Sequence, residues 1–209
     1  MGRRFAVGLG CSIVVVLAFA SACRAGGGTY VFAGGTAAEQ AQVRAALDAS
    51  SFDWSLVPNQ VRIHIARGLP LSYSTPGQIW LDANLLDAGT FSWGVVQMEY
   101  AQHVQYALVN PSLRAQLTTE LGARQWCYES VSLPRGANGC ERFSAMLAWA
   151  YWPSAQNSMR PSGPGDWSAS MNAADFRALL AQLIGAPDPI GQLSLRNVAG
   201  RLGAHAAGR

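Results

Sequence analysis

Hydrophobic residues along the chain follow first a helical spacing and then a strand spacing. Over Thr36–Ser50, apolar positions recur every three to four residues after a threonine that can cap a helix, which predicts a first helix. Apolar and polar residues alternate at Val61–Ala66, and a short β-branched and aromatic run follows at Gln78–Asp82. These two runs predict strands of one small sheet, separated by a turn rich in proline and glycine.

The second half of the chain has the spacing of helices. The longest pattern, Phe91–Val109, ends before a proline and shows an apolar stripe at three-and-four spacing. Further helices are predicted at Ser112–Leu121, Cys140–Trp152 and Met171–Ile184, and the second of these is apolar nearly all round, so we expect it to be buried. A small sheet packed against a mostly helical remainder predicts an α+β fold.

The N-terminus has the three parts of a secretory signal over residues 1–22: two early arginines, an apolar stretch over residues 5–20, and small residues at 20–22. Cys23 follows directly and resembles the cysteine of a bacterial lipoprotein cleavage box, which carries the lipid. Cleavage near the same point without lipidation and a retained membrane anchor are the alternatives. We therefore expect an exported protein, either lipid-anchored through Cys23 on the extracytoplasmic face of the membrane or secreted.

The rest of the chain has room for one domain. Of the 209 residues, 50% are hydrophobic and 13% are charged, which suits a single core. The glycine-rich segment 23–35 predicts a flexible tether, residues 36–190 the folded domain, and residues 191–209 a weakly ordered tail.

The charge of the chain argues against a nucleic-acid partner. Every basic residue other than histidine is an arginine, and two of the 15 lie in the leader, which leaves 13 arginines against 12 acidic residues. A net charge of about +1 without a run of adjacent basic residues lacks the electrostatic footprint that binds phosphates.

Two cysteines remain for the folded domain. Cys127 and Cys140 flank an irregular segment, and in an oxidising exported environment the simplest interpretation is a disulfide that closes this loop. A metal site is the less favoured interpretation, because the pair lacks C-x-x-C spacing.

One helix carries residues of chemical interest. In an H-E-x-x-H helix, two histidines four residues apart bind zinc and the glutamate between them acts as general base on the zinc-bound water. Glu99 occupies the glutamate position, whereas Met98 and Gln102 occupy the two histidine positions. A thioether and an amide are not usual zinc ligands, so the general base is present without its metal ligands.

The surrounding sequence resembles a zincin, the fold of H-E-x-x-H metallopeptidases. The run from Gly94 to Gln105 is similar to the V-x-x-H-E-Y-A-H-H-V-Q run of small exported bacterial zinc metallopeptidases, and Gly77–Leu81 is similar to the G-x-I-x-L strand that precedes it. The run Cys140–Ala150 resembles an E-x-F-A-D-type helix, which implies that Glu141 stands where the third metal ligand does. The resemblance implies a zincin-like α+β fold with a degenerate active-site helix.

Two catalytic alternatives stay open. In the first, Glu99, His103 and Glu141 bind a cation together, because His103 is four residues after Glu99 on the helix. In the second, a glycosidase uses paired carboxylates, for example Glu99 with Glu141 or with Asp82. The sequence has no nucleophile elbow, phosphate-binding loop or dinucleotide-binding glycine motif.

The expected function is therefore a non-catalytic pseudopeptidase that binds a peptide, a protein or a cell-envelope component, and needs no cofactor. An active metallopeptidase with zinc or another metal on Glu99, His103 and Glu141 is one alternative. A structural envelope lipoprotein is the other.

Overall fold

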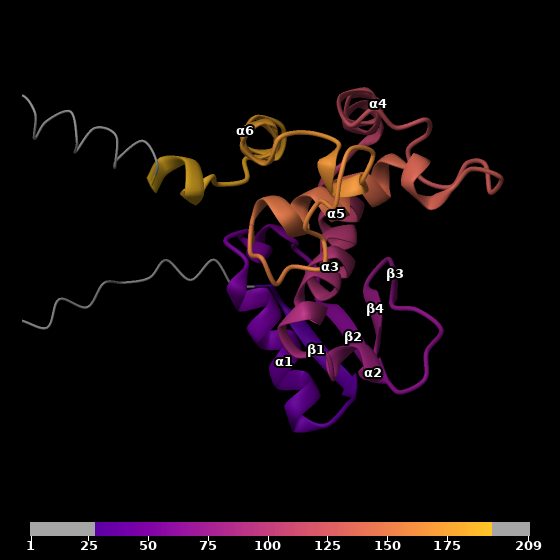
Figure 1. The fold of residues 1–209 in the computed structure, drawn as a ribbon, viewed down its shortest axis with the longest axis vertical. Helices are drawn as coiled ribbons and strands as arrows, with labels where there is room; N and C mark the ends of the chain where they lie inside the picture. The colour runs from indigo at the N-terminus through magenta and orange to yellow at the C-terminus, as the bar shows by residue number, and fades with distance from the viewer. Residues whose placement is uncertain (1–27, 194–209) are drawn as a thin grey trace, which may run out of the picture.

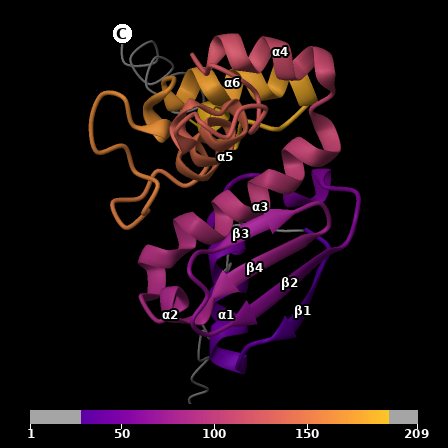
Figure 2. The ribbon, with the colours of Figure 1, turned by 90° about the vertical axis from the view of Figure 1, so that its right-hand side faces the viewer.

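A four-stranded sheet forms one half of the molecule, as the computed structural model of residues 28–193 shows (Figure 1 and Figure 2). The strands are β1 (Tyr30–Gly34), β2 (Val61–Ala66), β3 (Tyr73–Thr75) and β4 (Gln78–Asp82). They lie in the order β1-β2-β4-β3, with β1, β2 and β4 parallel and β3 antiparallel to β4. The strands predicted at Val61–Ala66 and Gln78–Asp82 are confirmed.

Strand β1 corrects the predicted tether. It occupies residues 30–34 of the 23–35 segment, so that part of the prediction is wrong, while residues 23–27 lie outside the described range. The strand pairs with β2 along its length, and Tyr30 and Phe32 pack against the core. Its flanking glycines resemble a linker in the sequence, but the open parallel edge of β2 supplies hydrogen bonds that only the folded chain reveals.

Apart from the four-residue helix at Ala83–Leu86, which was not predicted, the helices lie close to their predicted positions. They are α1 (Ala37–Ala49), α2 (Ala83–Leu86), α3 (Trp93–Leu108), α4 (Pro111–Glu120), α5 (Gly139–Ala150) and α6 (Ala173–Ile184). Single 3₁₀ turns are η1 (Trp54–Leu56), η2 (Gly89–Ser92), η3 (Arg135–Ala137) and η4 (Trp167–Ala169). Among residues 28–193, no helix is both long and apolar enough to cross a membrane.

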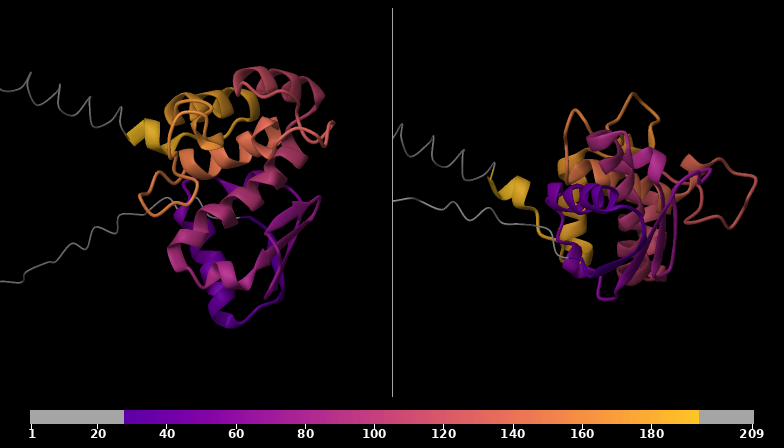
Figure 3. Two further views of the ribbon diagram at one scale, coloured as in Figure 1. Left: turned by 45° about the vertical axis from the view of Figure 1, so that its right-hand side comes forward. Right: turned by 90° about the horizontal axis from the view of Figure 1, so that it is seen from below.

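Helix α3 joins the two halves of the molecule. It runs between the sheet and the helices α4, α5 and α6, and α5 packs along it (Figure 2 and Figure 3). Every residue from Val96 to Gln105 is buried, including several polar ones. The buried side of the sheet, with Ile63, Ile79 and Leu81, belongs to the same core as α3 and α5. This mixed arrangement agrees with the predicted α+β class.

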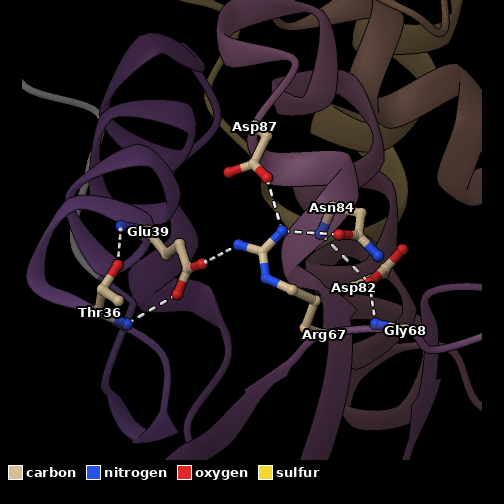
Figure 4. A network of polar contacts seen from close by, with 7 residues as sticks. All are labelled: Thr36, Glu39, Arg67, Gly68, Asp82, Asn84 and Asp87. Carbon is tan, nitrogen blue, oxygen red and sulfur yellow. Dashed lines mark hydrogen bonds and ion pairs between the residues drawn. The ribbon is translucent and has the colours of Figure 1, made fainter.

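A polar network ties α1, α2 and the end of β2 together at the surface (Figure 4). The Arg67 guanidinium contacts Glu39 at 2.8 Å, Asp87 at 2.7 Å and the Asn84 side-chain oxygen at 2.6 Å. Glu39 also completes a capping box with Thr36 at the start of α1. The network therefore holds the start of α1 against the end of β2. Exposed ion pairs of this kind add little to the free energy of unfolding.

The disulfide between Cys127 and Cys140 is present, which confirms the predicted pairing. It links the start of α5 to the segment that follows α4 and closes an irregular loop over residues 128–139. We call this segment the disulfide loop. Its residues Tyr128 and Arg135 line a pocket together with Glu99 of α3.

Candidate functional site

Two adjoining pockets lie over the middle of α3. Pocket A, of about 310 Å³, is lined by Glu99 and Gln102 of α3, Glu141 of α5 and residues of β3 and the disulfide loop. Pocket B, of about 270 Å³, is lined by Met98 of α3, by Ala145 of α5 and by apolar and polar residues of the segment 158–168. Leu71, Glu99 and Arg135 line both pockets, so the two form one cleft. Glu99 lies at their junction.

Glu99 is a buried carboxyl with a single side-chain partner among residues 28–193. Only 3% of the residue is exposed, and its Oε2 accepts a hydrogen bond of 2.7 Å from the Ser74 hydroxyl, which β3 holds in place. Burial raises the pKa of Glu99 to about 7, although the Ser74 hydrogen bond and the charge of Arg135 lower it and the charge of Glu141 raises it further. Glu99 therefore changes its charge near neutral pH.

Glu141 lies in the same pocket, but both of its oxygens are in contact with protein groups. The Tyr128 hydroxyl donates to Oε1 at 2.6 Å, and Arg135 Nε lies 2.8 Å from Oε2. The guanidinium of Arg135 also lies 5.4 Å from the centre of the Trp167 ring, a cation–π contact. Glu99 and Glu141 thus line one pocket, and Arg135, which lines it too, pairs with Glu141 there.

The disulfide loop supplies the partners of Glu141. Tyr128 follows the disulfide directly and has a φ of 58°, the one positive value among the described non-glycine residues. Its backbone N–H donates to Asn138 Oδ1 at 2.9 Å, which holds the loop against the start of α5. The sequence pattern did not identify Tyr128 or Arg135, because an irregular loop has no periodicity that would show where its side chains point. The predicted disulfide was the one indication that this segment lies close to Glu141.

Met98 and Gln102, which the resemblance sets at the two histidine positions, have different surroundings. Met98 is buried against Ala145 and Ala148 of α5 and lines pocket B. Gln102 lines pocket A, and its side-chain oxygen accepts a hydrogen bond from Gln105. One position is therefore an apolar wall, and the amide at the other is already paired.

His103 is not brought together with the two glutamates. It lines a separate pocket with Val57 and Pro76, and Tyr106, whose ring centroid lies 5.6 Å from that of His103, stands between this pocket and pocket A. Burial lowers the pKa of His103 to about 4, against the effect of a hydrogen bond with the Gln78 backbone. The structure therefore does not bring His103 into one pocket with Glu99 and Glu141.

The residues of this cleft do not fit a zinc ion. Within residues 28–193, no group of three His, Cys, Asp or Glu side chains is arranged to hold a metal. The oxygens of Glu141 are engaged by Tyr128 and Arg135, and a guanidinium at this distance would repel a divalent cation.

Two further candidates lie elsewhere. Asp82, considered as a carboxylate partner of Glu99, caps α2 through the N–H of Asn84 and binds the backbone of Gly68, so it serves local structure. Cys23, the predicted lipidation site, lies outside the described residues.

Known proteins offer no independent assignment of this cleft. A comparison of the chain with protein-family models, with curated proteins and with solved structures finds no match.

Proposed function

We propose that this chain is an exported, zincin-like pseudopeptidase, which holds a peptide or another cell-envelope component in the α3 cleft without cleaving it. The observation that carries the proposal is the ion pair between Arg135 and Glu141. At the position that the resemblance gives to the third metal ligand, the carboxylate is neutralised by a protein cation. Met98 and Gln102 stand at the two other ligand positions.

The charges of the cleft support the absence of metal-dependent catalysis. A catalytic zinc ion needs three protein ligands and an open position for water. The guanidinium of Arg135 neutralises Glu141 as a metal ion would. Unlike zinc, it is not a Lewis acid and cannot activate a bound water. Glu99 retains the position of the general base but has no metal-bound water to deprotonate.

The shape and lining of the cleft support ligand binding. Both pockets combine polar and apolar side chains: pocket A has Glu99 and Gln102 beside tyrosine rings, and pocket B has Met98, Met159 and Trp167 beside serine hydroxyls and Asp166. A cleft of two adjoining pockets with mixed linings suits a peptide, because an extended chain presents both polar backbone groups and apolar side chains along its length.

The decisive experiment combines metal analysis with peptide binding. Purified protein is dialysed against micromolar zinc and analysed for bound metal, and is then incubated with a fluorescent peptide library. We expect peptides to bind without cleavage and without stoichiometric metal. Zinc-dependent hydrolysis of any library member would show that the protein is an enzyme.

Matched surface variants test whether binding occurs in this cleft. Leu71 is 53% exposed and lines both pockets, so the uncharged substitution Leu71→Asn changes the cleft with little effect on the core. Val131 is 92% exposed, lines neither pocket and provides the control Val131→Asn. We expect peptide affinity to fall in the first variant only. Equal affinity in both variants would move the binding site elsewhere.

Membrane attachment through Cys23 is part of the same proposal. The variant Cys23→Ser should move the protein from the membrane fraction to the soluble exported fraction. A structural lipoprotein would show the same release but no peptide binding in either form.

A further inference from the structure

We propose that pocket A recognises a primary ammonium group, such as the side chain of a lysine or a free amino terminus, with Glu99 as its counter-ion. This inference rests on the proposed function and names the chemistry of the ligand that the cleft would take.

The first argument is the incomplete pairing of Glu99. The residue is 97% buried, as its exposed fraction of 3% shows, and it lines the pocket. Its Oε2 accepts from Ser74, whereas Oε1 receives no hydrogen bond from residues 28–193. An ionised carboxylate away from water is strongly disfavoured unless a cation or several donors surround it. A ligand that brings both a positive charge and N–H donors meets this requirement.

The second argument is the charge balance of the pocket. Arg135 and Glu141 form one neutral ion pair with a distance of 2.8 Å. Glu99 is left without a cation in direct contact among the described residues, so the pocket has one uncompensated negative charge when Glu99 is ionised. Carboxylates in a buried pocket disfavour an anionic ligand, and an ammonium ion restores neutrality.

The third argument is the aromatic lining. Tyr73, Tyr106 and Tyr128 line pocket A, and Tyr128 commits its hydroxyl to Glu141. Electron-rich rings around a carboxylate are a favourable environment for organic cations, which aromatic faces attract. The volume of about 310 Å³ admits a lysine side chain.

Binding should depend on pH through Glu99. The ionisable groups around it are Glu141 of α5, Arg135 of η3, Tyr73 of β3, Tyr106 of α3, Tyr128 of the disulfide loop and, in pocket B, Asp166. The pKa of Tyr128 is raised to about 12 by burial and by its hydrogen bond to Glu141, and that of Asp166 is lowered by hydrogen bonds from Ser162 and Ser168 that outweigh its burial. Because the pKa of Glu99 is about 7, the ionised fraction of this carboxyl is roughly ten times smaller at pH 6 than at pH 8. The affinity for an ammonium group should fall by the same factor.

The test uses n-butylammonium as the probe and the purified full chain. Affinity is measured by calorimetry at pH 8 and pH 6, with n-butanol as an uncharged probe of the same length. We expect saturable binding of the ammonium at pH 8, roughly tenfold weaker binding at pH 6, and no comparable binding of n-butanol. Equal binding of the two probes would overturn the proposal.

Two variants with opposite expected effects on ammonium affinity, and one control, test whether the ligand binds at Glu99. Glu99→Gln keeps the size of the side chain and should weaken ammonium binding at least tenfold, roughly the loss expected for one missing counter-ion. Glu120→Gln, on the exposed face of α4, should leave it unchanged. Arg135→Gln removes the competing positive charge and should strengthen binding. Unchanged affinity in Glu99→Gln, or stoichiometric zinc bound through Glu99, would contradict the assignment.

Peptides separate a failure of this inference from a failure of the proposed function. If lysine-free, N-acetylated peptides bind the cleft as tightly as their free-amino counterparts, the ammonium assignment is wrong while peptide binding stands. If no peptide binds and the wild type hydrolyses peptides with zinc, the proposed function itself is wrong.

Discussion

Burial of Glu99 makes folding take up a proton near neutral pH. Its pKa in the folded state is about 7, above the ordinary value of 4.5. Between these two values the folded chain holds a proton that the unfolded chain has lost. The free energy of unfolding therefore decreases as the pH rises through this window, because the folded state binds more protons.

The variant Glu99→Gln should remove this pH dependence. Ionisation of the buried carboxyl lowers the free energy of unfolding by up to roughly 3 kcal/mol. This loss is complete above pH 7, the folded pKa, and absent below pH 4.5, the unfolded pKa. We expect urea denaturation to show the variant more stable than wild type at pH 8 and about equal at pH 4.5. The difference between the two proteins isolates Glu99 from His103, whose lowered pKa acts with the opposite sign.

Glu120→Gln is the control for this measurement, because Glu120 is exposed in α4. An identical pH profile for wild type and Glu99→Gln would mean that Glu99 is ionised in the folded state and has a cation that the described residues do not supply.

The sequence predicted some residues of the cleft and missed others for a physical reason. Glu99 and Glu141 lie on helices that periodicity predicts, and the resemblance to zincins implied that the two carboxylates are neighbours. Ser74, Tyr128 and Arg135 come from a short edge strand and an irregular loop, where the direction of a side chain depends on tertiary contacts. His103 lies one helical turn after Glu99 and lines a separate pocket, which Tyr106 divides from pocket A; helical spacing alone could not show this.

At the scale of elements, the disulfide that closes the disulfide loop should stabilise the fold and hold the loop that contributes to pocket A. Replacement of both cysteines, Cys127→Ser with Cys140→Ser, should lower the free energy of unfolding by roughly 3 kcal/mol in the loop-entropy model. The measurement is urea denaturation of the double variant and of the wild type treated with a reductant, which should agree with each other. An unchanged midpoint would show that the hydrogen bonds of Asn138 alone order the loop.

The start of α3 depends on close packing at Gly94. A Cβ at this position would overlap with the side chain of Asn157, and would lie 2.6 Å from Ser158 Oγ and 3.0 Å from Met159 N. Gly94→Ala should therefore destabilise the protein by about 1–3 kcal/mol and disturb pocket B, which Ser158 and Met159 line.

The matched control is Gly163→Ala, where a Cβ meets no atom within 4 Å. Thermal unfolding of the two variants should show a lower Tm for the first and little change for the second. Equal Tm values would mean that the segment 157–159 moves away from α3 without cost.

Helices and strands differed in how well the sequence predicted them. The helices have recognisable ends, such as the capping Asn172 and the left-handed Gly185 around α6, where φ is 69°. β1 and β3 have only five and three residues, and their pairing partners are distant or separated by a turn. The flanking glycines of β1 resemble a linker and β3 has only three residues, so neither has the local pattern by which the five-residue β4 was predicted.

At the scale of the whole molecule, one hydrophobic core spans both halves. It includes Ile63 of the sheet, Tyr100 of α3, Phe143 of α5 and Phe176 of α6. We expect one unfolding transition with the same midpoint by tryptophan fluorescence and by far-UV circular dichroism. Separate midpoints for the two probes would show that the sheet and the helical half unfold independently.

The position of α3 also determines how a ligand can enter the cleft. The helix forms the floor of both pockets and is buried between the sheet and α5, so the halves cannot swing apart without exposing the core. The floor of the cleft is therefore formed before any ligand arrives, and no closure of one half onto the other has to follow. Association should proceed in a single kinetic phase whose rate rises linearly with ligand concentration, and the lifetime of the complex rather than the speed of encounter should distinguish good ligands from poor ones.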